Sequence, residues 1–266
     1  MNNTEHTGEP QRFPQFPKIR PVLPAAYQAL YEDEYLANRT SGGFANKLAR
    51  KLESWMHVRV SRTALAKRSE EILELGAGSL NHLPWEKDFS TYDIVEPFHK
   101  LFESSNNLRL IRSAYDQLSA IPPEVQYDRI VSIAVLEHML DLPQEIALAG
   151  VHLRDGGTFC AGIPSEGGWL WEMAWRYGTG MAFRCRTGLD YTPMMHYEHV
   201  NTADEIETCI RYFFRDVVIT RFPLPARSLS LYTFLRATGT DKERCARFLE
   251  CRRREGAPEI RRAEDV

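Results

Sequence analysis

The residues best suited to chemistry in this chain are two glycines and two glutamates around its first apolar segments. Gly76 and Gly78 follow a short apolar run that carries Glu74, and Glu96 ends the next apolar run, about 20 residues later. Glycine lacks a Cβ and tolerates positive φ, so this turn lets the backbone approach a ligand closely. A carboxylate at the end of the neighbouring strand suits the two hydroxyls of a ribose. The spacing therefore predicts a site for a nucleoside cofactor.

The dinucleotide fingerprint Gly-x-Gly-x-x-Gly is incomplete, because Asn81 stands at the place of its third glycine. Glu74 is also no part of that fingerprint. The segment instead resembles the first motif of the class I S-adenosylmethionine (SAM)-dependent methyltransferases, (V/I/L)-(L/V)-(E/D)-x-G-x-G. The matching residues are Ile72-Leu73-Glu74-Leu75-Gly76-Ala77-Gly78. Leu80 occupies the place of a third glycine that many of these enzymes carry.

Two further segments extend the resemblance, because they are similar to the fourth strand with its exit and to the turn into strand five. These are Tyr127-Asp128-Arg129-Ile130-Val131-Ser132-Ile133-Ala134-Val135-Leu136-Glu137-His138 and Leu153-Arg154-Asp155-Gly156-Gly157-Thr158-Phe159. In the second, Asp155 replaces the usual proline. The alternatives are a Rossmann-like domain for another nucleotide, such as a nicotinamide oxidoreductase, and a non-catalytic SAM-binding regulatory protein.

The resemblance implies that SAM is the cofactor and assigns its contacts. Glu96 would bind both ribose hydroxyls, and the turn from Gly76 through Ala77 to Gly78 would pass beside the cofactor. Glu74 would steady that turn or meet the cofactor's ammonium through water. Ala134, at the end of strand four, would face the methionine part. The residues expected after strand three, near adenine, are Ser113, Ala114 and Tyr115, with Asp116 compensating for an aspartate usual at position 113.

Methyl transfer to a hydroxyl needs a proton acceptor near neutral pH, a range in which histidine titrates. His138, just past strand four, is the first candidate, and His196 and His199 are the second. The alternatives are that Glu137 and His138 only cap or pack the next helix, and that the other two histidines shape a pocket or satisfy local hydrogen bonds. Further pocket candidates are Asp190 and Tyr191. The His-x-x-His spacing differs from the His-x-x-x-His of zinc hydrolases, so we expect no metal.

Alternating strand and helix patterns predict an α/β fold with a parallel sheet covered on both faces. The resemblance implies a three-layer, Rossmann-like sheet of seven mostly parallel strands that ends in a C-terminal β-hairpin. The expected strands are residues 71–75, 92–96, 108–112, 128–134, 157–163, 216–221 and 229–236. Ligands bind such sheets at the carboxyl ends of the strands, where the named motifs fall. Thr202 and Glu205 predict the start of a helix over 202–213.

We expect one methyltransferase domain over residues 25–240, with leading helices before its first strand. A disordered or extended arm, residues 1–24, would precede it, and a charged, solvated helix or tail, residues 241–266, would follow. Residues 164–200 interrupt the pattern with a tryptophan-rich helix that is apolar nearly all round, which is typical of a buried or interface helix. We interpret this insertion as a substrate cover; extra core and contact with a lipid surface are the alternatives.

Composition narrows the classes of protein. The chain is 43% hydrophobic and 26% charged, as soluble domains are, and its net charge of −3 argues against a broad nucleic-acid interface. It has no apolar run long enough to span a bilayer and no signal-peptide pattern, so we expect a cytoplasmic protein. Five scattered cysteines support neither disulfides nor a zinc ribbon. The expected partner is a small-molecule or glycan acceptor, with peripheral membrane contact as an option and the oligomeric state open.

Overall fold

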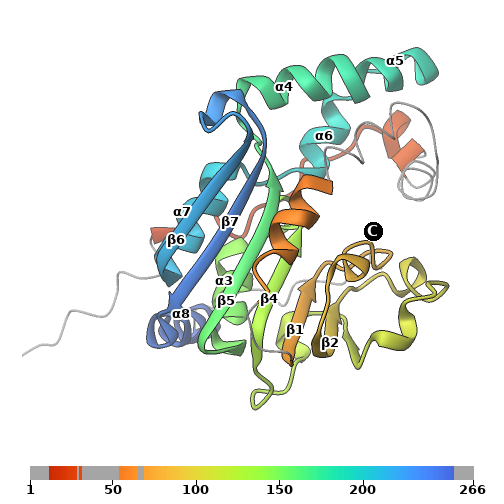
Figure 1. Ribbon diagram of the computed structural model, residues 1–266. Coiled ribbons are helices and arrows are strands. Elements are labelled where there is room, and N and C mark those ends of the chain that lie inside the picture. The colour runs from red at the N-terminus through yellow and green to blue at the C-terminus, as the bar shows by residue number, and fades with distance from the viewer. Residues whose placement is uncertain (1–11, 29, 32–53, 65–68, 255–266) are drawn as a thin grey trace, which may run out of the picture.

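A computed structural model describes residues 12–28, 30–31, 54–64 and 69–254, and its centre is one seven-stranded sheet. The strand order is β3-β2-β1-β4-β5-β7-β6, with β7 antiparallel to both of its neighbours and the other pairs parallel (Figure 1). The strands are β1 Glu70–Leu75, β2 Phe89–Val95, β3 Ser113–Tyr115, β4 Tyr127–Ile133, β5 Leu153–Pro164, β6 Phe214–Pro223 and β7 Ser230–Thr240. The predicted α/β fold and its C-terminal hairpin are confirmed.

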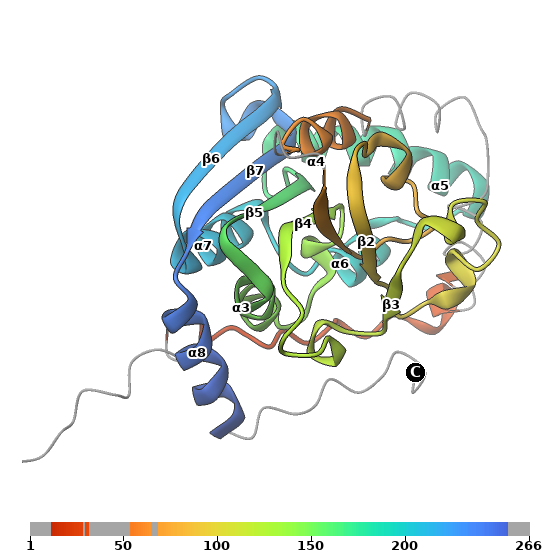
Figure 2. The ribbon, with the colours of Figure 1, turned by 60° about the horizontal axis from the view of Figure 1, so that its bottom comes forward.

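Helices cover the sheet in three groups (Figures 1 and 2). One face carries α3 Leu142–His152, α7 Ala203–Phe213 and α8 Lys242–Arg254. The helical residues 54–61 lie on the other face. Beyond the carboxyl end of β5 lie α4 Trp169–Trp175, the π-helix η7 Arg176–Gly180, α5 Met181–Thr187 and α6 Thr192–Glu198. Short 3₁₀ turns complete the connections: η2 Leu83–Trp85, η3 His99–Leu101, η4 Leu108–Leu110, η5 Leu118–Ala120, η6 Leu136–His138 and η8 Arg227–Leu229.

Each face of the sheet packs into its own apolar cluster. Leu73 and Leu75 of β1 face the cluster under α3, α7 and α8, whereas Ile72 faces the cluster that includes Val60. The strand order reverses at β1, which lies between β2 and β4. At such a switch point the connections leave in opposite directions and open a crevice at the carboxyl ends of the strands. The glycine turn after β1 lies at this point.

The strand expected over residues 108–112 is wrong. Leu108 and Leu110 belong to η4 and are 40% and 46% exposed, so their alternation marks a surface turn and no half-buried strand. The third strand is the three-residue β3, which pairs with Asp93–Val95 of β2. So short a strand carries too few residues to show a period-2 pattern.

The tryptophan-rich helix, expected to be buried or to form an interface, is buried on one side only. Trp175 is 5% exposed, but Trp169 is 60% exposed, and Tyr177 and Met181 are exposed as well. The helix therefore has one covered and one open side.

The capping box at α7 is confirmed: the Thr202 side chain accepts from the Glu205 N–H, and the Glu205 carboxylate accepts from the Thr202 N–H.

Both ends of the described chain pack on the face that carries α3. In the arm, Phe13 and Phe16 are buried beside α8, and Lys18 forms a 2.6 Å ion pair with Glu205. The charged helix expected at the C-terminus forms as α8, but it is solvated on one side only, because Phe248 is buried and Arg252 pairs with Asp141. Of the leading helices expected before the first strand, the part over residues 32–53 lies outside the described residues.

Candidate functional site

The turn after β1 has the conformation that its glycines allow. Gly76 and Gly78 have φ of +66° and +50°, a region that side chains with a Cβ disfavour. The Gly76 N–H donates to the carbonyl of Val95 at 2.8 Å. A Cβ on Gly76 would lie 2.3 Å from Cγ2 of Val135, so glycine is also required by its neighbour. The turn therefore packs directly against the chain that leaves β4.

Glu96 joins β2 to this turn. Its Oε2 accepts from the Gly78 N–H at 2.8 Å, and its Oε1 accepts from the Phe98 N–H at 3.0 Å. The side chain is buried, and the Glu96 N–H donates to the carbonyl of Tyr115 on β3. An ionised carboxylate offers about four acceptor sites, so two remain for ligand hydroxyls. This arrangement fits a ribose diol.

Glu74 lies in β1, two residues before the turn, and its side chain is in the interior. Its carboxylate is buried and accepts from the Tyr92 hydroxyl at 2.8 Å. Burial raises the pKa of Glu74 to about 7, and the nearby His82 and the Tyr92 hydroxyl offset only part of that rise. The group therefore ionises near neutral pH.

Near Glu74 lies a buried ion-pair network that no local sequence pattern predicts. Arg129 of β4 donates to Glu86 at 2.9 and 2.5 Å and to Glu70 at 3.0 Å, and His82 bonds to Glu86 at 2.7 Å. All four side chains are buried. A buried pair of this kind holds the β1 start and η2 in register with β4, because separating its charges is costly.

Two predictions about the crevice walls have different outcomes. Ala134 directly follows β4 with φ of +54°, an uncommon conformation for a residue with a Cβ, and it is exposed at the carboxyl edge. The expectation that Ser113, Ala114 and Tyr115 follow the third strand is wrong, because they form it. Asp116, the next residue, pairs with His99 at 2.8 Å.

Beside Ala134, at the exits of β4 and β5, lies a polar cluster built on His138 and His199. Their ring centroids are 4.9 Å apart. Nδ1 of His138 donates to the carbonyl of Glu198 at 2.8 Å, and Nδ1 of His199 is hydrogen-bonded to the Glu166 carboxylate. Glu137 completes the cluster with a buried carboxylate, and the indole of Trp171 stacks on the His199 ring. We call these residues the His138–His199 cluster.

The electrostatics of the cluster separate its two histidines. Burial and the neighbouring His199 lower the pKa of His138 to about 4. Burial alone would lower the pKa of His199, but the Glu166 hydrogen bond and the charges of Glu137, Glu166 and Glu198 outweigh it, so that pKa is raised. Burial raises the pKa of Glu137 to about 7.

The other predicted residues of this region lie outside the cluster. His196 is exposed on α6. Asp190 accepts from the Thr192 N–H at 3.1 Å at the start of α6, and the Tyr191 ring packs on Phe183. Sequence reasoning missed Glu166 and Glu198, since no periodic pattern links a residue after β5 to one at the end of α6.

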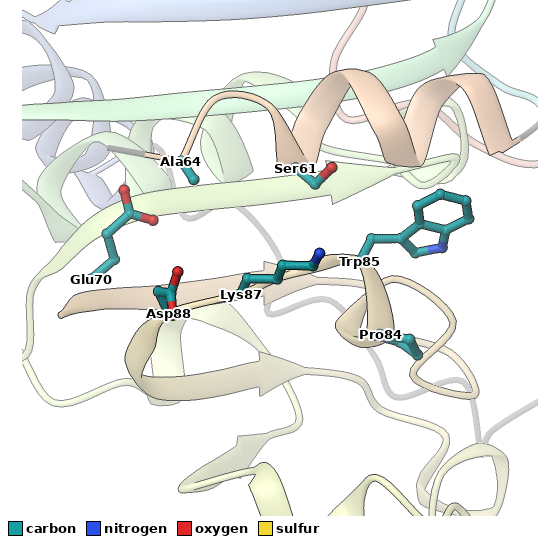
Figure 3. A pocket seen from close by; sticks show the side chains of 7 residues that line it. All are labelled: Ser61, Ala64, Glu70, Pro84, Trp85, Lys87 and Asp88. Carbon is teal, nitrogen blue, oxygen red and sulfur yellow. The ribbon is translucent and has the colours of Figure 1, made fainter. Parts of the chain in front are cut away.

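A separate hollow of about 530 Å³ lies beside the start of β1 (Figure 3). Its lining residues are Ser61, Ala64, Glu70, Pro84, Trp85, Lys87 and Asp88. Glu70 is the first residue of β1, whereas Gly76 follows its last, so this hollow is at the opposite end of the strand from the glycine turn.

None of the described helices is both long and apolar enough to cross a bilayer.

The family model that matches this chain and three solved structures of similar fold are all named as methyltransferases. A family model described as a methyltransferase domain matches residues 44–201, and no curated protein matches. A SAM-dependent methyltransferase from Thermotoga maritima, a possible histamine N-methyltransferase, is 13% identical at TM-score 0.51, with 80% of this chain and 97% of that one covered. The N-methyltransferase NodS from Bradyrhizobium japonicum WM9, in complex with S-adenosyl-L-homocysteine, is 14% identical at TM-score 0.53, with 81% and 99% covered. The CurJ carbon methyltransferase is 16% identical at TM-score 0.50, with 71% and 55% covered.

Proposed function

This chain belongs to the methyltransferase-domain family and is a SAM-dependent methyltransferase, and we propose that its acceptor is a hydroxyl group of a small molecule or saccharide. The three solved structures described above are named for methyl transfer to nitrogen or to carbon, and at 13–16% identity they show the fold alone. The acceptor must therefore be argued from the residues of this chain.

The crevice at the switch point fits the cofactor. Glu96 would bind the ribose hydroxyls with the acceptor sites that Gly78 and Phe98 leave over. The turn from Gly76 to Gly78 would pass beside the nucleoside, and Ala134 would face the methionine part. SAM supplies a methyl group already activated by a positive sulfur. The protein's main task is then to hold donor and acceptor in line, which is worth several kcal/mol of the barrier.

The observation that supports a hydroxyl acceptor is the bonding of His138 and His199. In each ring Nδ1 is occupied by an oxygen partner, which leaves Nε2 to face a ligand. An alcohol holds its proton well above neutral pH, so it needs a group nearby that promotes the loss of that proton. His138 of the His138–His199 cluster follows Ala134 closely in the chain, at the same edge of the sheet. We therefore place the acceptor at this cluster.

The test is transfer of a trideuteromethyl group from labelled SAM into metabolites of a cell extract, followed by mass spectrometry. We expect one or a few labelled products in which fragmentation places the methyl group on oxygen. The Glu96→Ala variant should form far less of them. Label on nitrogen or carbon would refute the hydroxyl acceptor, and no label in any extract fraction would refute small-molecule transfer.

A further inference from the structure

The His138–His199 cluster brings three side chains of metal-binding types together. Glu137, His138 and His199 each offer one ligand atom, and these atoms lie within 4.8 Å of one another. They come from η6, directly after β4, and from the residue after α6. The backbone fixes this pairing, because the N–H groups of Val200 and Asn201 both donate to the carbonyl of Glu137, at 2.9 and 3.0 Å.

The two rings are oriented as metal-binding histidines are. A histidine that binds a metal through one nitrogen usually donates its other N–H to a carbonyl or carboxylate, which fixes the tautomer. Nδ1 of His138 has the carbonyl of Glu198 as its partner, and Nδ1 of His199 has the carboxylate of Glu166. Both Nε2 atoms are thereby left as the electron-pair donors.

The third side chain carries an unsatisfied atom. Glu137 is 1% exposed, and its Oε2 has no hydrogen-bond partner among the described residues. A buried acceptor left without a partner costs about 1–3 kcal/mol. Its Oε1 lies 3.8 Å from Nε2 of His138, so the carboxylate reaches the side of the ring where the free nitrogen is. A cation bound there would satisfy the carboxylate.

The surrounding charge favours a cation. Glu166 and Glu198 add two more carboxylates to the cluster, and Oε2 of Glu198 lies 3.6 Å from Nδ1 of His138. The guanidinium of Arg20 approaches from the arm, but it donates to the backbone carbonyls of His138 and Tyr197. The carboxylates of the cluster therefore have no arginine or lysine partner among the side chains described around it.

We propose that Glu137, His138 and His199 bind a divalent transition-metal ion of the zinc or manganese type. Two imidazoles and one carboxylate form a facial set that such ions accept, with open positions for a substrate oxygen. Ligand atoms around zinc are about 3.3 Å apart, given bonds of about 2.0–2.1 Å, so side-chain movements of roughly 1 Å would close the site. The ion would lower the pKa of an acceptor hydroxyl, whose proton then leaves to water; this role rests on the proposed function, whereas the site itself does not.

The experiment uses untagged full-length protein, stripped with a chelator and titrated with Co²⁺ as a spectroscopic probe and with Zn²⁺ by calorimetry. We expect one ion per chain and visible Co²⁺ bands of a histidine-containing site. Glu137→Gln should weaken binding at least tenfold, and His199→Ala should do the same in case the buried Gln variant folds poorly. His196→Ala is the matched control, because this exposed histidine lies three residues from His199, and its affinity should equal that of the wild type.

S-adenosylhomocysteine binding, measured on the same samples, separates this inference from the proposed function. If Glu137→Gln loses metal binding but keeps the wild-type affinity for S-adenosylhomocysteine, the result supports the metal site. No binding of either ion by wild-type protein at millimolar concentration would overturn it, as would equal affinity in wild type and both variants. Full methyl transfer by metal-free protein in the presence of a chelator would overturn the ion's role in lowering the pKa of the acceptor, while leaving the methyltransferase assignment intact.

Discussion

The backbone N–H of Gly78 donates a 2.8 Å hydrogen bond to Oε2 of Glu96, which joins the end of β2 to the glycine turn after β1. The carboxylate expected to bind the ribose is thus held by the same turn that the nucleoside must pass. Its position is set before any ligand arrives, because Phe98 donates to its second oxygen. A preorganised acceptor loses little conformational entropy when a ligand binds.

Replacing Glu96 by alanine should weaken S-adenosylhomocysteine binding by roughly 1–3 kcal/mol, since it removes charge-assisted hydrogen bonds. Isothermal calorimetry on folded protein measures this directly. Glu243→Gln is the control, because that carboxylate is 90% exposed on α8 and should leave the affinity unchanged. Equal affinities for wild type and Glu96→Ala would remove Glu96 from the cofactor site.

Glu74 makes stability depend on pH. Its pKa is about 7 in the folded protein against 4.5 ordinarily, so between these values the unfolded chain ionises first and stability falls as pH rises. Above pH 7 the loss is complete. Glu74→Gln removes this pH dependence, and the Gln oxygen can still accept a hydrogen bond from the Tyr92 hydroxyl. In urea denaturation of cofactor-free protein, the free energy of unfolding of the variant should rise by roughly 2–3 kcal/mol relative to that of wild type between pH 5 and pH 8. A constant difference between the two proteins would contradict the assignment.

Glu166 should act through His199. Its carboxylate is hydrogen-bonded to Nδ1 of His199, so Glu166→Gln loosens the orientation of that ring. We expect kcat to fall by about tenfold to a hundredfold with S-adenosylhomocysteine affinity nearly unchanged. Comparison of kcat with the calorimetric Kd checks this. A parallel loss of both would point to a general structural role for Glu166.

Arg129 should be one of the most sensitive positions for folding. Arg129→Met leaves Glu70 and Glu86 buried without their shared cation, and breaking such a pair costs about 3–5 kcal/mol. Arg211→Met is the matched control, because its pair with Glu207 is half exposed and worth about 0–1 kcal/mol. Equal denaturation midpoints for the two variants would show that the network contributes little.

Local patterns in the sequence predicted the glycine turn after β1 and the position of Glu96 beside it, and for a physical reason. The motif that ends in Gly76 and Gly78 encodes a backbone conformation, and Glu96 directly follows the next strand of the chain, β2, so adjacent segments contain the information. The capping box of Thr202 and Glu205 is local in the same sense. The strand at Ser113–Tyr115 escaped prediction because three residues show no period.

The acceptor side could be predicted only in part. His138 and His199 were both named from the sequence, but nothing local indicated that they share one cluster or that Glu166 orients the second ring. That contact joins the exit of β5 to the end of α6, and it exists only once the insertion has folded over the sheet. The sequence did not distinguish a buried helix from an interface helix at α4 and η7, because apolar residues on all sides of a helix are typical of both.

The most direct test of the account is a crystal structure of the protein in complex with S-adenosylhomocysteine. We predict that both ribose hydroxyls lie within hydrogen-bonding distance of the Glu96 carboxylate, with the sulfur directed toward Ala134 and the His138–His199 cluster. A ligand bound elsewhere, or a crevice between the Gly76–Gly78 turn and Glu96 that stays closed at saturating ligand, would contradict it.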